Sequence, residues 1–283
     1  MSGPALRLSI AHRTDYRYAS YATSSYNEIR MTPANSDGQR LLSSSISVSP
    51  NALLFEFDDY FGTHCYCFDI QHPHNSLAIA ANSIVEVSRA GYVGKRISRV
   101  ELSHAQVRER YYEFLAETPL ALASGAVRDA AQEITYQLEP EDAIGAVAEW
   151  IQSRLTFGKG LTHARTPAMD ALAVGVGVCQ DFSHLGISML RSVGIPARYV
   201  SGYLFPVLEP ERGLSTEGES HAWVEAWIGG WRAFDSANGM DHIDNRYVKV
   251  GVGRDYLDVA PMNGVYTGQG TDPPQVSVTM SVL

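Results

Sequence analysis

Apolar and polar residues alternate in short runs over the first third of the chain, residues 6–90. In the run Leu6–Ile10 every second residue is apolar, and Ile46 and Val48 alternate with serines. This two-residue period is typical of strands with one buried face, and the turn-forming pair Pro50-Asn51 follows the second run. The pattern predicts an antiparallel β domain, which we place at residues 1–98.

The hydrophobic spacing becomes helical beyond Ser103. Ile144, Val147, Ile151 and Leu155 recur at three- and four-residue intervals, and acidic residues precede them, as is typical of a first helical turn. Helices are predicted over 105–115, 139–155, 166–172 and 179–194, and strands over 197–205, 221–228 and 231–235, with further β structure to the C-terminus. Helices followed by antiparallel strands indicate an α+β domain at residues 99–283.

The composition is that of a globular protein. The 283 residues are 45 % hydrophobic and 19 % charged, with a formal net charge of −9. This negative charge argues against a nucleic-acid partner, because phosphate binding needs a basic surface. No apolar run of about 18 residues could span a bilayer, and the first residues lack the basic and apolar regions of a signal peptide. We therefore expect a cytoplasmic protein without a membrane partner; the oligomeric state stays open.

Histidines and cysteines are concentrated near residue 70. The cluster consists of His64, Cys65, Cys67, His72 and His74. Such ligands could hold zinc, but zinc-binding pairs usually have two to four residues between them, whereas Cys65 and Cys67 have one. Alternation with Tyr66 and Phe68 is better explained by a half-buried strand. We expect no metal and no cofactor, and three cysteines do not indicate a disulfide framework.

Cys179 is the strongest candidate for chemistry. It follows the glycine-rich run Gly175–Val178 and begins the predicted helix over 179–194. A thiol at a helix N-terminus faces free backbone N–H groups and the positive end of the helix dipole. Both favour the nucleophilic thiolate, and such environments lower a cysteine pKa into the range of roughly 3.5–7.5.

Two further residues complete a candidate catalytic set. His221 and Asp235 lie on neighbouring predicted strands that Gly229 and Gly230 join as a hairpin, so their side chains could meet near one end. Taken singly, Cys, His and Asp more often serve structure, but together they form the nucleophile, base and orienting carboxylate of a thiol hydrolase or acyltransferase. His184 points about 140° from Cys179 on the same helix and is expected to be a packed, hydrogen-bonded residue.

The sequence resembles the bacterial transglutaminase-like proteins, many of which are described as candidate cysteine proteases. The matching segments are Gly177–Leu185, Gly194–Leu204, Ser220–Glu225, Phe234–Gly239, Gly251–Pro261 and, in the N-terminal region, Asp59–Gly62. The resemblance implies a papain/transglutaminase-like core behind an all-β N-terminal domain, with Cys179, His221 and Asp235 as the triad. Two positions differ from the usual family pattern: Ser183 replaces an alanine, and Phe157 replaces an aromatic residue that is often tyrosine.

This set would act on an amide of a protein or peptide. The thiolate would form a thioester, and the oxyanion would be met by the Cys179 N–H and by a second donor, which is Gln180, Tyr203 or a tryptophan. Water would complete hydrolysis and an amine would complete transamidation, so the triad alone does not separate a protease or amidase from a transglutaminase. A third reading is a retired binding module, which the intact triad disfavours.

Overall fold

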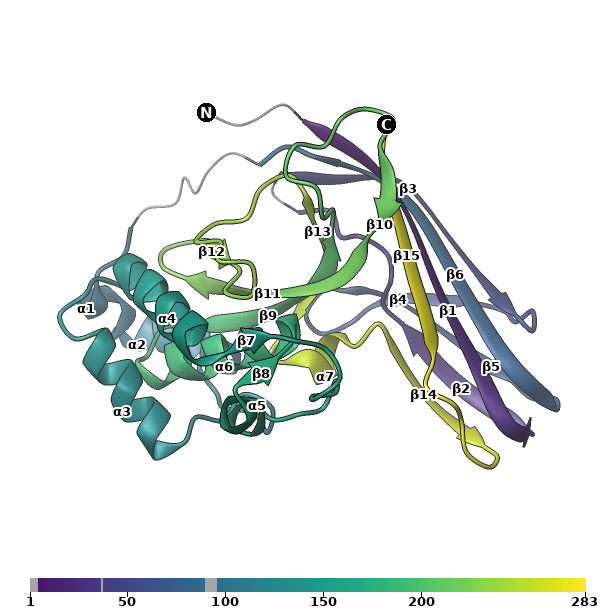
Figure 1. Ribbon diagram of the computed structural model, residues 1–283, viewed down its shortest axis with the longest axis horizontal. Helices are drawn as coiled ribbons and strands as arrows, with labels where there is room; N and C mark the ends of the chain where they lie inside the picture. The colour runs from purple at the N-terminus through teal and green to yellow at the C-terminus, as the bar shows by residue number, and fades with distance from the viewer. Residues whose placement is uncertain (1–4, 37, 90–95) are drawn as a thin grey trace.

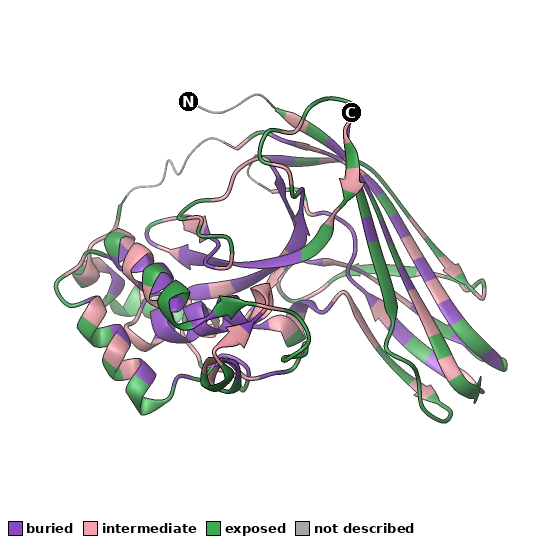
Figure 2. Ribbon diagram, in the orientation of Figure 1, coloured by how far each residue is buried: buried purple, intermediate pink, exposed green. Residues whose placement is uncertain are grey.

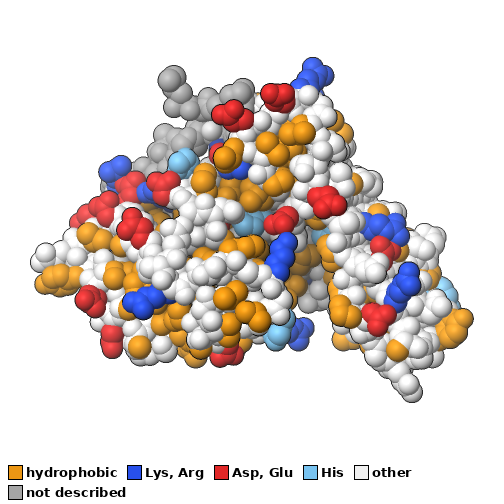
Figure 3. All heavy atoms as spheres, in the orientation of Figure 1, with side chains coloured by type: hydrophobic (Ala, Val, Ile, Leu, Met, Phe, Trp, Pro, Cys, Tyr) orange, Lys and Arg blue, Asp and Glu red, His pale blue; other side chains and the backbone are white. Residues whose placement is uncertain are grey.

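The computed structural model describes residues 5–36, 38–89 and 96–283 and shows two lobes. Helices cluster in one lobe and long strands in the other, and a four-stranded sheet lies between them (Figure 1). Acidic and basic side chains are interspersed over the face that Figure 3 shows. Within the described part of the chain, no helix has both the length and the apolar character needed to cross a bilayer.

The predicted β domain is present. Its strands are β1 (Leu6–Ala22), β2 (Ser24–Ile29), β3 (Gln39–Ser49), β4 (Phe55–Asp58), β5 (His64–Ile70) and β6 (His74–Val87). Alternate residues of β1 are buried, so Leu8 and Ile10 face inward as the two-residue period requires. Residues 1–4, 37 and 90–95 of the predicted domain lie outside the described residues.

The strands form two sheets that residues from the second half of the chain complete. The sheet orders are β10-β15-β1-β6-β3 and β14-β2-β5-β4. The added strands are β10 (Ser215–Glu217), β14 (Met262–Thr267) and β15 (Gln275–Val282). Ile29, Phe68 and Leu77 belong to the apolar core that both sheets share. The β lobe is thus built from both sides of residue 98. The chain enters it again through β10, between two strands of the central four-stranded sheet, and through β14 and β15 after the last strand of that sheet.

The chain from residue 99 onward is mixed α and β, as predicted. Its helices are α1 (Arg99–Leu102), α2 (Ala105–Arg110), the 3₁₀ helix η1 (Tyr112–Phe114), α3 (Gly125–Ile134), α4 (Pro140–Arg154), α5 (Ala168–Val174), α6 (Cys179–Ser192) and α7 (Tyr256–Val259). The expected helix over 105–115 is broken at Tyr111, whose ring packs on Trp227 with centroids 4.2 Å apart. The helix α3, which the sequence pattern did not reveal, begins where the Ser124 hydroxyl accepts the Val127 N–H.

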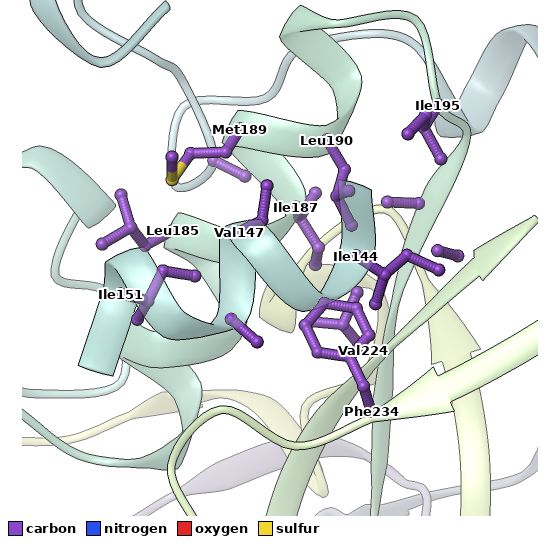
Figure 4. Packing of buried hydrophobic residues seen from close by; sticks show 14 of the residues in the cluster. Ile144, Val147, Ile151, Leu185, Ile187, Met189, Leu190, Ile195, Val224 and Phe234 are labelled. Atoms are coloured by element: carbon purple, nitrogen blue, oxygen red, sulfur yellow. The ribbon is translucent and has the colours of Figure 1, made fainter. Parts of the chain in front are cut away.

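The helix α6 forms the centre of the helical lobe. Every residue from Asp181 to Arg191 is buried, and Figure 2 shows most of the helix in the colour of buried residues. Leu185 and Ile187 pack with Ile144 and Ile151 of α4 and with Val224 of the central sheet (Figure 4). Burying such a side chain contributes about 1.5–3 kcal/mol, so this packing holds the beginning of α6 in place.

The central sheet faces α6 on one side. Its order is β12-β11-β9-β13, with β9 (Ala197–Leu204), β11 (Glu219–Trp227), β12 (Trp231–Phe234) and β13 (Tyr247–Gly253). A short parallel pair, β7 (Thr156–Phe157) and β8 (Val176–Gly177), leads into α6. Tyr203 and Val248 of the central sheet share a buried cluster with Leu8 and Met280, so the two lobes pack through an apolar contact.

Candidate active site

Cys179 is the first residue of α6, where the sequence placed it. Val178 is extended and caps the helix, and the Gly158 N–H donates to the Gly177 carbonyl at 2.9 Å, which fixes the strand before the thiol. Cys179 is half-buried and free. The prediction that a helix begins at Cys179 is confirmed.

Asp181, which sequence analysis did not single out, shapes this turn. Its carboxylate is fully buried and accepts the Val178 N–H at 2.8 Å and the Thr162 hydroxyl at 2.7 Å. A Cβ on Gly177 would lie 2.7 Å from the Asp181 Cβ, so only glycine fits there. Burial raises the pKa of Asp181 despite these hydrogen bonds. The sequence feature that could have predicted this role is an acidic residue at the third position of the helix, where its side chain can accept the backbone N–H of the N-cap residue.

The two residues that differ from the usual family pattern lie beside the nucleophile. The Ser183 hydroxyl donates to the Cys179 carbonyl at 2.8 Å, so the serine is satisfied within its own helix. Phe157 pairs with Gly177 in the β7–β8 ladder, and its side chain is exposed. Neither residue contacts the His–Asp pair in the described hydrogen bonds.

His221 and Asp235 meet as the hairpin predicts. The strands β11 and β12 are antiparallel, and Gly229 between them has a φ of 99°, a conformation that favours glycine. The His221 Nε2 lies 2.7 Å from the Asp235 Oδ2, and both side chains are almost fully buried. Because Nε2 faces the carboxylate, Nδ1 is the ring nitrogen left for Cys179, which helps to raise the pKa of His221.

Asp235 is held by more donors than the sequence suggested. Its Oδ2 also accepts the Asn238 amide at 2.7 Å and the Tyr247 hydroxyl at 2.9 Å, and its Oδ1 accepts the Ala237 N–H at 3.0 Å. Tyr247 lies on β13, 12 residues away in sequence, and no motif signals it. These bonds fix the carboxylate in the orientation that the imidazole needs.

The His–Asp pair is polarised toward the charged state. Burial lowers the pKa of His221, but the hydrogen bond with Asp235 and the interaction with Cys179 outweigh it and raise that pKa to about 10. Burial raises the pKa of Asp235, but hydrogen bonds from His221, Asn238 and Tyr247 outweigh it and leave that pKa below its ordinary value. The site therefore favours an imidazolium on His221 beside the carboxylate of Asp235.

His184 lies behind the nucleophile, turned into the core. It is fully buried, its Nε2 accepts the Tyr256 N–H at 3.2 Å, and its ring packs 5.1 Å from the ring of Tyr199. Burial lowers its pKa to about 3, so it stays neutral. The expectation of a packed, hydrogen-bonded histidine is confirmed. Burial raises the pKa of Tyr199, so this phenol also stays neutral.

The three proposed oxyanion donors differ in what they already bind. The Gln180 amide donates to the His163 carbonyl at 2.7 Å, and the Tyr203 hydroxyl donates to the Met31 carbonyl at 3.2 Å. The Trp223 ring stacks near His221, and its buried N–H has no acceptor in the described part of the chain. Trp223 is therefore the donor of the three that has a free N–H.

The histidine–cysteine cluster near residue 70 is spread over a strand and its ends. The Cys65 thiol is buried and donates to the Thr63 carbonyl, His64 pairs with Asp58 at 3.0 Å, and His74 bonds the His72 carbonyl. Across residues 5–36, 38–89 and 96–283, no three His, Cys, Asp or Glu side chains converge as a metal site.

Comparison with known proteins agrees with this architecture. Residues 8–86 match the family model "bacterial transglutaminase-like N-terminal region", and residues 128–236 match the transglutaminase-like superfamily core. An uncharacterized protein of Mycobacterium leprae is 39 % identical over 98 % of this chain and 99 % of its own length. The chain belongs to the bacterial transglutaminase-like family.

Further relatives and a solved structure cover the whole chain. An uncharacterized protein of Mycobacterium tuberculosis is 32 % identical over 96 % of this chain and 91 % of its own. The structure of a candidate cysteine protease from Cytophaga hutchinsonii superposes with a TM-score of 0.76 at 24 % identity, covering 100 % of this chain and 99 % of that one. This likeness establishes the transglutaminase-like fold with its N-terminal β domain.

Proposed function

We propose that the protein cleaves peptide or isopeptide amides through a thioester on Cys179, with His221 and Asp235 completing the triad. One observation carries the proposal: His221 is bonded to Asp235 at 2.7 Å through Nε2, both side chains are almost fully buried, and Cys179 at the start of α6 acts on His221 to raise its pKa. A scaffold requires no such polarised arrangement, whereas nucleophilic catalysis requires each part of it.

The reaction follows from these positions. The thiolate attacks the amide carbon, and the negative charge moves to the carbonyl oxygen, where the Cys179 N–H meets it. The His221 imidazolium gives its Nδ1 proton to the amide nitrogen, the C–N bond breaks, and the amine leaves. Water then attacks the thioester while His221 takes one of its protons, and the C–S bond breaks. The thiolate and the imidazolium are restored, and the released carboxylic acid loses its remaining proton to the solvent.

Transamidation by an amine is the second candidate, and acidic residues near His221 favour it. Glu217 and Glu219 directly precede the base and could attract a lysine side chain. A lysine must lose its proton to attack, however, and nearby carboxylates favour its charged form. We therefore infer that water is the main acceptor.

The test supplies a peptide amide together with millimolar primary amine and quantifies both products. We expect mostly carboxylate product; an excess of amine adduct would instead identify a transglutaminase. A complete absence of both products, with Cys179 still labelled by alkylating reagents, would indicate a binding module. The three free cysteines suit a reducing compartment, so we place the protein in the cytoplasm, which cell fractionation tests.

A further inference from the structure

An exposed ion pair joins the two sides of the site. The Lys159 Nζ lies 3.0 Å from the Glu219 Oε1. Lys159 comes two residues after the end of β7, the strand that pairs with β8 just before Cys179. Glu219 is the first residue of β11 and lies two residues before His221. The pair therefore links the loop on the nucleophile side to the strand that carries the base.

The Lys159 side is anchored to the beginning of α6. Besides the Gly158–Gly177 backbone bond, the Thr162 hydroxyl binds Asp181, and the His163 carbonyl accepts the Gln180 amide at 2.7 Å. These contacts wrap the loop 158–163 around the residues on both sides of Cys179. Lys159 thus extends from a fixed backbone next to the nucleophile.

The Glu219 side is anchored to both lobes. The Gly218 N–H donates to the Val278 carbonyl of β15 at 2.9 Å, and Glu219 pairs with Leu204 in the central sheet. Because side chains on a strand alternate between faces, Glu219 points to the same face as His221. The carboxylate is thus held on the side of the site from which the proton is delivered.

The ion pair itself is easily opened. The side chains of Lys159 and Glu219 are 71 % and 53 % exposed, and an exposed pair of this kind adds little to stability. A substrate with matching charges could replace both partners at little cost. The charges would then select the substrate without blocking access to the thiol.

Building on the proposed amidase function, we propose that Lys159 and Glu219 determine the charge specificity of this site. The acyl group stays on Cys179, beside Lys159, and the amine leaves with the proton of His221, beside Glu219. The proposed substrate is therefore an amide with a carboxylate on its acyl part and a positively charged group on its leaving amine. A peptide bond between an acidic residue and a following basic residue has this arrangement. Each charge of the substrate takes the place of one member of the ion pair.

The test compares kcat/KM for four peptides that differ only in the charges on the two sides of the scissile amide. We expect the acidic–basic peptide to be preferred over the basic–acidic one by about fivefold or more, as for one or two exposed ion pairs. The double substitution Lys159→Glu with Glu219→Lys keeps a bridge but exchanges its charges, so it should reverse the preference. As a matched control, Arg7→Ala removes an exposed pair with Glu86 in the β lobe and should leave the ratio unchanged.

A second readout does not depend on amide hydrolysis. Cys179 is labelled with anionic, neutral and cationic thiosulfonates, and each rate is compared with that of the neutral reagent. We expect Lys159→Ala to slow labelling by the anionic reagent and Glu219→Gln to slow labelling by the cationic reagent. Charge-dependent labelling without turnover would support the charge assignment and refute the amidase function. Amide hydrolysis whose charge preference survives the exchange would overturn the charge assignment and leave the amidase function intact.

Discussion

Replacing Asp235 by asparagine probes the catalytic pair with almost no change in shape. The orientation of the new amide is determined by the backbone. The Asp235 Oδ1 accepts the N–H groups of Ala237 and Asn238 at 3.0 and 3.4 Å, so the asparagine oxygen must occupy this position. The amide nitrogen then occupies the Oδ2 position, where it faces the Nε2 of His221.

The tautomer of His221 must change in response. An N–H that faces Nε2 requires this nitrogen to be bare, and the ring proton then moves to Nδ1, toward Cys179. An imidazole in this state cannot take the thiol proton. The same substitution in a triad of this kind lowers turnover by about 10⁴, which corresponds to about 5.5 kcal/mol of transition-state stabilisation. The pKa of His221, now about 10, should also fall toward its ordinary value, because its carboxylate partner is lost.

The assay is kcat on a peptide amide, normalised to protein that is folded by circular dichroism. Asp241→Asn is the matched control, because this exposed aspartate follows β12 in the same loop and bonds only its neighbour His242 in the described side-chain hydrogen bonds. The control should keep its turnover. If Asp235→Asn lowers kcat by less than tenfold while folding normally, the orienting role does not belong to Asp235, and Asn238 is the next candidate.

Three more results are expected. Turnover should fall as pH rises through about 10, because His221 then loses the proton that it gives to the amine. The raised pKa of His221 also stabilises the fold: this contribution is full below pH 6.5 and is lost as pH rises through about 10, which urea titrations at several pH values measure. Alkylation at pH 7 should label Cys179 far faster than Cys65, whose pKa is raised to about 12 mainly by burial; mass spectrometry showing the reverse order would refute the nucleophile assignment. Gly177→Ala should lower the free energy of unfolding by about 1–3 kcal/mol and reduce turnover, because its Cβ displaces Asp181; unchanged thermal melting would show that the turn relaxes freely.

Local patterns predicted the parts of the site that local sequence determines. The glycine-rich run and the apolar spacing after Cys179 place a helix start at that residue, and the structure begins α6 there. Two glycines between β-like segments predict the hairpin that brings His221 to Asp235. In each case neighbouring residues determine the geometry, through backbone conformation and hydrophobic periodicity.

Residues that act through the tertiary structure could not be found in this way. Tyr247 reaches Asp235 because β13 pairs with β9 in the central sheet, and nothing near Tyr247 in the sequence indicates this pairing. Likewise β15 lies beside β1 because residues 275–282 return to the β lobe, a long-range pairing that no local pattern specifies. The position of Glu219 in its ion pair with Lys159 also depends on a long-range pairing, because β10 pairs with β15 in the β lobe just before β11 begins.

The formation of an acyl-enzyme on Cys179 is the central claim and can be measured directly. The protein is mixed with an activated peptide ester or amide, quenched in acid, digested and analysed by mass spectrometry. The account predicts an acyl adduct on the peptide that contains Cys179, its decay to carboxylate product, and its absence in Cys179→Ala. Product formation without any adduct at Cys179, or undiminished turnover in Cys179→Ala, would contradict it.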